Sequence, residues 1–145
     1  MTQCLRRIIV AEDDHTTRNL IFTALGLLAL PDSPQLVETT DGQEALAALR
    51  AGGADVVILD WHMEGMDGLE CARRIRAGEH GISPTTPIIL LTGADDAGAE
   101  EKAREAGVDL FVRKPFSPRQ FRRWIAMAIE RRRRGGREQG GAVCE

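Results

Sequence analysis

Three short runs of the sequence are apolar at every position: residues 8–10, 56–59 and 88–91. A strand with one face in water alternates apolar and polar residues, so an unbroken apolar run predicts a strand covered on both faces, as in a parallel sheet. Two weaker candidates, 36–39 and 110–112, complete a set of five, and stretches with helical character lie between them. A β-α pattern repeated five times predicts an α/β fold with a doubly wound, five-stranded parallel sheet.

Apolar periodicity and glycine or proline stop signals place the helices between and after these strands. We expect them at about 14–29, 41–52, 68–78, 95–106 and 121–134. In the first helix we assign the inward stripe to Leu20, Ala24, Leu27 and Leu28. The last helix has one apolar face at helical spacing, formed by Phe121, Trp124, Ile125, Ala128 and Ile129.

The fourth predicted helix differs from the others because it has no large apolar residue. Its only candidates for burial are Ala97, Ala99, Ala103 and Ala106. Buried apolar surface contributes roughly 25 cal/mol per Å², so alanine side chains dock a helix weakly. We therefore expect this helix to be the least firmly held.

The length of 145 residues favours one domain, which we place at residues 6–134. The glycine-rich polar segment 135–145 is predicted to be a disordered tail. No apolar run approaches the roughly 20 residues of a membrane span, and acids at 12–14 interrupt the stretch that a signal peptide needs. The three cysteines are widely spaced and form no metal pattern. We expect a cytoplasmic protein with reduced thiols and no membrane partner.

Polar side chains stand where four of the five predicted strands end. They are Glu12 and Asp13 after the first, Asp60 at the end of the third, Thr92 after the fourth and Lys114 after the fifth. The carboxyl ends of parallel strands share one rim, and in the strand order 2-1-3-4-5 the first and third strands are neighbours. Three carboxylates brought together repel one another, and Mg²⁺ relieves that repulsion. The rim is therefore predicted to bind a divalent cation and a phosphoryl group.

An aspartate at the end of an apolar strand is a candidate nucleophile, because carboxylates can form aspartyl phosphates. Asp60 has this position, the Thr92 hydroxyl can donate to a phosphoryl oxygen, and Lys114 supplies positive charge. Only two lysines occur against 17 arginines, which favours a specific role for Lys114. Simpler explanations stay open: a turn aspartate, a threonine at a strand exit and a solvated lysine. The acidic run at 12–14 could also only cap the following helix, with Asp14 as N-cap.

Four segments at these strand ends together resemble the receiver domain of two-component response regulators. They are IIVAEDD (8–14), VVILDWHMEGMDG (56–68), PIILLTG (87–93) and FVRKPF (111–116), and the likeness covers about residues 6–130. The resemblance implies a flavodoxin-like fold and a stand-alone regulator similar to those of chemotaxis. It also implies transfer of a phosphoryl group onto Asp60 from a sensor histidine kinase or a histidine phosphotransfer protein.

The same resemblance implies a set of metal ligands. Glu12 and Asp13 correspond to the acidic pair that holds Mg²⁺ in this family. Asp60 and the backbone carbonyl of His62 would complete the protein ligands.

The resemblance also implies a switch. Thr92 and Lys114 correspond to the family's switch hydroxyl and lysine, and Phe111 to its aromatic switch position. The bond between Lys114 and Pro115 is expected to be cis. Thr92 would move toward phosphorylated Asp60, Phe111 would turn inward, and the fourth helix would shift.

The output implied for such a domain is binding of a downstream protein through the fourth helix, fifth strand and fifth helix. A phosphorelay intermediate, a phosphate sink and a fragment of a larger hybrid protein are alternatives. A Mg²⁺-dependent aspartyl-phosphate phosphatase is a remote one, because such enzymes generally have a second aspartate where His62 stands. We expect a phosphoacceptor signalling domain rather than an enzyme, and a monomer or weak homodimer.

The sequence departs from the family pattern at three positions near Asp60 and Thr92. Glu64 stands where the family often has proline, which predicts a more mobile loop. His62 is less usual at its position, and its side chain either faces solvent or alters dephosphorylation or metal affinity. Ala94 offers no side-chain hydrogen bond to an attacking water.

Charge is unevenly distributed along a chain whose net charge is −3. Residues 1–116 carry 11 basic and 19 acidic side chains, whereas residues 117–145 carry 8 arginines and 3 glutamates. The run from Arg131 to Arg134 is explained either as a solvated helix end that suits the helix dipole or as a surface for an acidic partner. Nucleic acid is not expected, because Trp124, the only nearby aromatic residue, belongs to the buried stripe.

Overall fold

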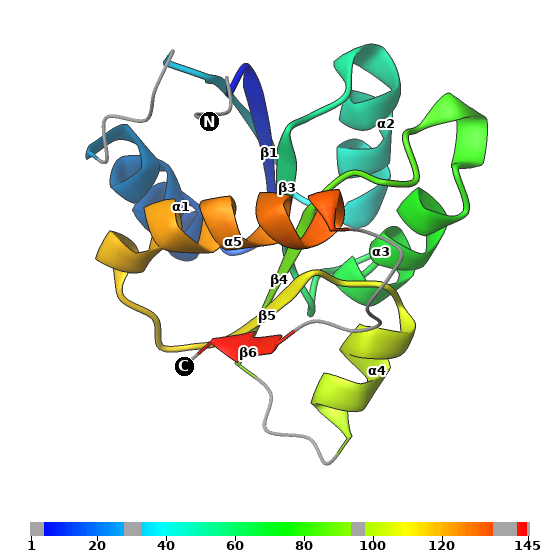
Figure 1. Cartoon of the computed structure of the whole chain (residues 1–145). Helices are drawn as coiled ribbons and strands as arrows, with labels where there is room; N and C mark the ends of the chain where they lie inside the picture. Colours follow the sequence, from blue (N-terminus) through cyan, green and yellow to red (C-terminus); the bar gives the residue numbers. More distant parts are fainter. Residues whose placement is uncertain (1–4, 28–32, 94–97, 135–141, 145) are drawn as a thin grey trace.

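The sheet contains six parallel strands in the order β2-β1-β3-β4-β5-β6 (Figure 1). The computed structural model describes residues 5–27, 33–93, 98–134 and 142–144. The strands are β1 (Arg7–Ala11), β2 (Gln35–Thr39), β3 (Val56–Asp60), β4 (Ile88–Thr92), β5 (Leu110–Arg113) and β6 (Ala142–Cys144). The helices are α1 (His15–Leu27), α2 (Gly42–Gly52), α3 (Gly68–Arg76), α4 (Ala99–Glu105) and α5 (Phe121–Arg133), with 3-10 turns η1 (Glu79–Gly81) and η2 (Pro118–Gln120). The predicted order of the first five strands and the five helices between and after them are confirmed.

Helices cover both faces of the sheet, as the unalternated strand sequences require. α1 and α5 lie on one face, and α2, α3 and α4 lie on the other (Figure 1). Successive side chains of β3 point to opposite faces of the sheet. Val56 and Ile58 join the core under α1 and α5, whereas Val57 and Leu59 join the core under α2 and α3. Every residue of β3 and β4 is buried, so these two strands form the centre of the fold.

The strand register fixes where the polar strand ends meet. Ala11 pairs with Leu59 across β1 and β3, so the residues that follow β1 lie beside Asp60. Asp60 pairs with Leu91 across β3 and β4, and Thr92 pairs with Arg113 across β4 and β5. The strands β1, β3, β4 and β5 therefore end within about one residue of the same level, at one rim of the sheet.

The inward stripe of α1 was predicted incorrectly. The buried residues are Ile21, Ala24 and Leu25, whereas Leu20 is 48% and Leu27 is 80% exposed; Leu28 lies outside the described residues. Apolar residues occur on nearly every side of this helix, so its sequence allows several phases. Packing against the sheet selects the phase in which Ile21 and Leu25, one turn apart, point inward.

The other helix faces agree with the prediction. All five predicted apolar residues of α5 are buried. Ala99, Ala103 and Ala106 of the fourth helical segment are buried as well, while Ala97 lies outside the described residues. Its weak hold on the sheet remains a prediction.

The predicted disordered tail needs a correction for residues 142–144, which form β6 and pair in parallel with β5. Without this pairing the outer edge of β5 would present unpaired backbone N–H and C=O groups, and such an edge is a template for an extended segment within reach. Residues 135–141 and Glu145 lie outside the described residues. The domain limits of 6–134 remain a prediction.

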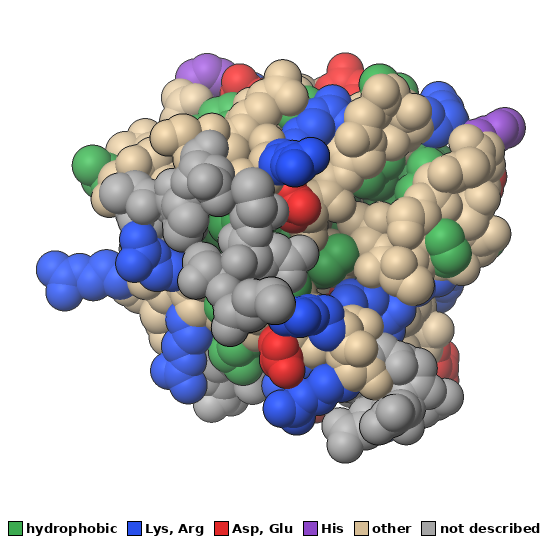
Figure 2. Space-filling model, turned by 45° about the horizontal axis from the view of Figure 1, so that its top comes forward, with side chains coloured by type: hydrophobic (Ala, Val, Ile, Leu, Met, Phe, Trp, Pro, Cys, Tyr) green, Lys and Arg blue, Asp and Glu red, His purple; other side chains and the backbone are tan. Residues whose placement is uncertain are grey.

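Arginine side chains stand out from the face that α5 crosses (Figure 2). α5 contains Arg122, Arg123 and the three consecutive arginines 131–133, against one acidic residue, Glu130. Basic residues in the last turn of a helix are favoured by the negative end of the helix dipole. The positive charge expected from composition is thus concentrated on one element.

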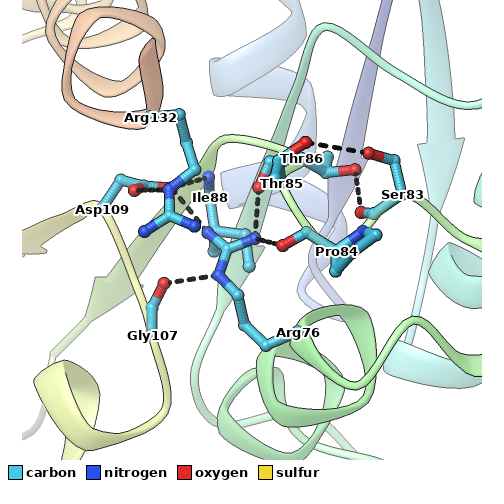
Figure 3. Close-up of polar contacts among 9 residues, drawn as sticks. All are labelled: Arg76, Ser83, Pro84, Thr85, Thr86, Ile88, Gly107, Asp109 and Arg132. Carbon is cyan, nitrogen blue, oxygen red and sulfur yellow. Dashed lines mark hydrogen bonds and ion pairs between the residues drawn. The ribbon is translucent and has the colours of Figure 1, made fainter. Parts of the chain in front are cut away.

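One residue of the arginine run has a structural role that the sequence did not reveal. The Arg132 Nε lies 2.6 Å from Asp109 Oδ1, and Arg76 Nη2 lies 2.7 Å from Asp109 Oδ2 (Figure 3). The same Asp109 carboxylate accepts a 2.8 Å hydrogen bond from the Ile88 amide. Arg76 also donates to the carbonyls of Gly107, Pro84 and Thr86. This network joins α3, α5 and the starts of β4 and β5, at the end of the sheet opposite the predicted site.

We predict that Asp109→Asn lowers the free energy of unfolding by about 3 kcal/mol, because it leaves two partly buried guanidiniums without their counter-charge. Urea unfolding monitored by circular dichroism would measure the change. The control is Glu130→Gln, which removes an exposed pair between Glu130 and Arg134 and should cost less than about 0.5 kcal/mol. Equal effects of the two substitutions would show that Asp109 does not hold the network together.

Candidate functional site

Three carboxylates meet at the carboxyl ends of β1 and β3. Glu12 directly follows β1, Asp13 is next, and Asp60 is the last residue of β3. One carboxylate oxygen from each lies within 4.8 Å of those of the other two. Glu12 and Asp60 are buried, with 1% and 5% of their surface exposed, whereas Asp13 is exposed. The structure therefore brings together the three side chains that the sequence indicated as a metal site.

Lys114, which follows β5, extends its ammonium into this acidic group. Its Nζ lies 2.8 Å from Asp60 Oδ1 and 3.7 Å from Glu12 Oε1. The backbone N–H of Lys114 donates a 2.7 Å hydrogen bond to the carbonyl of Thr92, which ties the lysine to the end of β4. The Lys114–Pro115 bond is cis, as expected. Lys114 is thus part of the site and not a solvated surface residue.

The ionised form of Glu12 is destabilised by its surroundings. Burial, followed by the neighbouring charge of Asp60, raises the pKa of Glu12 to about 8, although Lys114 acts in the opposite direction. Its Oε2 is buried without a hydrogen-bond partner among the described residues. A buried acceptor of this kind is costly unless another group binds it. An orphaned oxygen among three oxygen donors fits a hard divalent cation such as Mg²⁺.

The acidic run 12–14 divides into two functions. Asp14 caps α1: its Oδ2 accepts hydrogen bonds of 2.8 and 2.7 Å from the N–H and hydroxyl of Thr17, and these bonds lower the pKa of Asp14. Asp13 Oδ2 instead accepts a 3.0 Å bond from the N–H of Glu64, in the loop after β3. The capping explanation therefore accounts for Asp14 and leaves Glu12 and Asp13 at the rim.

The loop after β3 is held close to Asp60 by a glycine. The N–H of Gly68 donates a 2.9 Å bond to the carbonyl of Trp61, and a Cβ at position 68 would collide with the carbonyl oxygen of Asp60. The side chain of His62 is exposed and stacks on Trp61, with ring centroids 5.6 Å apart. This placement agrees with a solvent-facing imidazole.

The two predicted switch residues are both buried beside the site. Thr92, the last residue of β4, has no exposed surface, and Phe111 of β5 is 2% exposed. Phe111 packs edge-on against Trp61 at 6.4 Å between ring centroids, and Arg113 Cζ lies 5.4 Å from the centre of the Phe111 ring. Phe111 thus has the inward position in this structure. Ala94 lies outside the described residues.

Trp61 is the site residue that the sequence analysis missed. It lies between Asp60 and the ring of Phe111, so it connects the end of β3 with β5. The available signal was an aromatic residue directly after the strand-end aspartate, where a polar loop residue is the usual expectation.

The pKa of Glu12 predicts how stability depends on pH. Glu12 ionises near 4.5 in the unfolded chain and near 8 in the folded protein, so the folded state binds more protons between these values. Its contribution to the free energy of unfolding therefore falls as pH rises through this window. From about pH 5 to about pH 8, the stability of Glu12→Gln should rise relative to wild type by on the order of 1–3 kcal/mol.

Urea unfolding with a metal chelator at several pH values would measure this difference. Glu64→Gln is the control, because it removes one negative charge from an exposed position on the same rim. A constant difference between Glu12→Gln and wild type across the pH range would contradict the prediction.

Comparisons with known proteins agree with the fold. Residues 8–126 match the family described as response regulator receiver domain. The chemotaxis protein CheY of Pseudomonas aeruginosa is 30% identical over 125 residues, which cover 86% of this chain and 97% of that protein. The phosphate regulon transcriptional regulatory protein PhoB of the same organism is 30% identical over 116 residues, covering 80% of this chain and 48% of PhoB.

Solved structures give the same result. A response regulator receiver domain protein from Clostridium thermocellum has a TM-score of 0.74 and 27% sequence identity, and the match covers 89% of this chain and 98% of that one. The receiver domain of the Francisella response regulator 1452 has a TM-score of 0.73 and 25% identity, covering 87% and 98%. The chain belongs to the response regulator receiver domain family of two-component systems.

Proposed function

We propose that this chain accepts a phosphoryl group on Asp60, in a Mg²⁺-dependent reaction, from a histidine kinase or a histidine phosphotransfer protein. Receiver domains of response regulators are phosphoacceptor signalling domains that interact with such donors and with downstream targets. The observation that supports the same role here is the 2.8 Å pair between Lys114 and Asp60 inside a cluster of three carboxylates.

In the proposed reaction, a carboxylate oxygen of Asp60 attacks the phosphorus of phosphohistidine. The O–P bond forms as the P–N bond breaks, and the imidazole of the donor leaves with the electron pair and takes up a proton. Lys114 is placed to balance negative charge on the transferring group, and electrostatic stabilisation of this kind is the main contribution in phosphoryl transfer. The reaction needs no further catalytic base, because Asp60 attacks as a carboxylate.

Glu12, Asp13 and Asp60 are the side chains that would hold Mg²⁺, and the backbone carbonyl of His62 would complete the protein ligands. The cation supplies positive charge that offsets repulsion among the carboxylates and the phosphoryl oxygens. Glu12 has a second effect that follows from its own protonation. Below its pKa of about 8 it carries a proton that must leave before it can act as a ligand.

The proposed output is a switch that reaches β5 from the end of β3. A phosphoryl group adds negative charge at Asp60, and the adjacent Thr92 hydroxyl can donate a hydrogen bond to it. Trp61 contacts Phe111 of β5, so a shift in the loop after β3 changes the packing of that ring. α4 follows β4 and buries only alanine side chains, which makes it the element with least to lose from a shift.

This chain spans nearly the whole length of CheY but about half of PhoB. Relatives of both lengths therefore bear on which output the phosphoacceptor site serves. A partner-binding regulator, a phosphorelay intermediate, a phosphate sink and the receiver portion of a larger hybrid protein all use the same phosphoacceptor site. Phosphotransfer from candidate kinases, followed by transfer back to a phosphotransfer protein, would separate the relay from the others.

We predict that acetyl phosphate with Mg²⁺ adds one phosphoryl group to the wild-type protein, seen as an increase in intact mass. The group should be released by hydroxylamine, as an acyl phosphate is. Asp60→Asn should abolish labelling while the circular dichroism spectrum stays unchanged. Asp55→Asn, which alters a carboxylate that accepts from the amides of Arg6 and Arg7, should retain labelling. Labelling of Asp60→Asn at the wild-type level would place the acceptor elsewhere.

We also predict that Mg²⁺ affinity rises with pH. Because Mg²⁺ displaces the proton of Glu12, the apparent Kd should fall about tenfold per pH unit as pH rises from about 6 toward 8, then level off. Titration with Mg²⁺ by calorimetry, in two buffers with different ionisation enthalpies, would count the proton released. Glu12→Gln should bind more weakly and without this pH dependence. Wild-type affinity that is constant over this range would show that Glu12 is not the displaced acid.

A further inference from the structure

The backbone of Glu12 is held from two neighbouring elements. Its N–H donates a 3.1 Å hydrogen bond to the carbonyl of Thr39, at the end of β2. Its carbonyl accepts a 2.8 Å hydrogen bond from Nη1 of Arg18, a residue of α1. That carbonyl belongs to the planar peptide group that joins Glu12 to Asp13, so the bond from Arg18 fixes the orientation of this group. From this contact we infer that Arg18 is a positioning residue for the Mg²⁺ site.

Arg18 is itself held firmly enough to fix another group. Its Nε lies 2.7 Å from Oε1 of Glu38 on β2, and only 11% of its side chain is exposed. Its backbone N–H donates a 2.9 Å bond to the carbonyl of Asp14, whose side chain caps α1. The planar guanidinium therefore bridges the first turn of α1 and the strand β2, and it contacts the residue after β1 from a fixed position.

The orientation of this peptide group matters because it links two of the proposed ligands. Glu12 is buried and Asp13 is exposed, so a rotation of the peptide between them would move one carboxylate inward and the other away from the rim. Mg²⁺ demands near-octahedral geometry at short distances and tolerates such displacements poorly. Groups that orient metal ligands without touching the metal change its affinity by about 10–100-fold when they are removed.

The charge of Arg18 would act on Mg²⁺ in the direction opposite to its positioning effect. A guanidinium beside a cation site repels the cation, so the loss of charge alone would strengthen Mg²⁺ binding. The loss of positioning would weaken it. The sign of the change in affinity therefore distinguishes the two effects.

The test measures Mg²⁺ affinity of the full chain by calorimetry at one fixed pH. Arg18→Gln should weaken binding roughly tenfold. The matched control is Arg7→Gln at the other end of β1, where the half-buried Arg7 donates bonds of 2.8 and 2.7 Å to the carbonyls of Ala48 and Gly53. It removes the same charge and comparable bonds, but it should change the affinity less than about twofold, because it lies far from the site.

Two further measurements separate positioning from a general loss of structure. Arg18→Lys keeps the charge, but one ammonium cannot reproduce the planar arrangement of both bonds, so this variant should bind Mg²⁺ more weakly than wild type even where Arg18→Gln does not fold. In labelling with acetyl phosphate, Arg18→Gln should need more Mg²⁺ for its half-maximal rate. Its rate at saturating Mg²⁺ should stay within about twofold of wild type, since the transferring groups are untouched.

Four results would overturn the inference: unchanged or tighter Mg²⁺ binding by Arg18→Gln, an equal loss in Arg7→Gln, wild-type affinity in Arg18→Lys, or a labelling rate of Arg18→Gln that stays low at saturating Mg²⁺. The inference rests on the proposed function, because it takes Glu12 and Asp13 as Mg²⁺ ligands. Failure of the proposed function would appear in the wild type, as no Mg²⁺ binding or no labelling at Asp60, and both would then fall. Failure of the inference alone would leave the wild type binding Mg²⁺ and labelled.

Discussion

Carboxylates that end up side by side in a folded chain repel one another, and this chain holds three of them within 4.8 Å at the end of a buried sheet. The register of β1 against β3 enforces this proximity, because β3 is buried throughout and β1 at every residue after Arg7, so neither can slip without exposing apolar residues. Lys114 offsets only part of the repulsion, and burial together with the charge of Asp60 still raises the pKa of Glu12. The hydrophobic core thus supplies the free energy that keeps the acidic site assembled, and the site can use that stored repulsion to attract a cation.

Hydrophobic pattern and strand order were enough to predict most of this architecture. The unbroken runs that became β3 and β4 indicated strands covered on both faces, and the order 2-1-3-4-5 expected of a doubly wound sheet brings Glu12, Asp13 and Asp60 to one rim. The phase of α1 was less determined, because its apolar residues surround the helix and only tertiary packing distinguishes Ile21 from Leu20. The tail was misjudged at 142–144, since glycine-rich composition says nothing about a free strand edge nearby.

Polar contacts between distant parts of the chain were the other feature that sequence could not supply. Asp109 meets Arg76 and Arg132 across separations of 33 and 23 residues, and no local periodicity records such a meeting. Trp61 was overlooked for a related reason, because its importance lies in its contact with Phe111 on another strand. The two ionic groups of the fold contrast in balance: the carboxyl end of the sheet has three acids and one lysine, whereas the amino end has one acid between two arginines. The amino-end group, in which both carboxylate oxygens are paired with arginines, holds the structure, and the acidic group, which has an excess of negative charge, is available for chemistry.

β5 separates these two ionic groups, with Asp109 just before its first residue and Lys114 just after its last. A strand rises about 3.3 Å per residue, so the two charged positions stand about 16 Å apart. Two unit charges at that separation interact by only about 1 kcal/mol at an effective dielectric constant of about 20, so direct Coulomb coupling between the rim and the amino end is small. A larger effect of one end on the other would have to pass through a displacement of the β5 backbone, which ion pairs anchor at both ends.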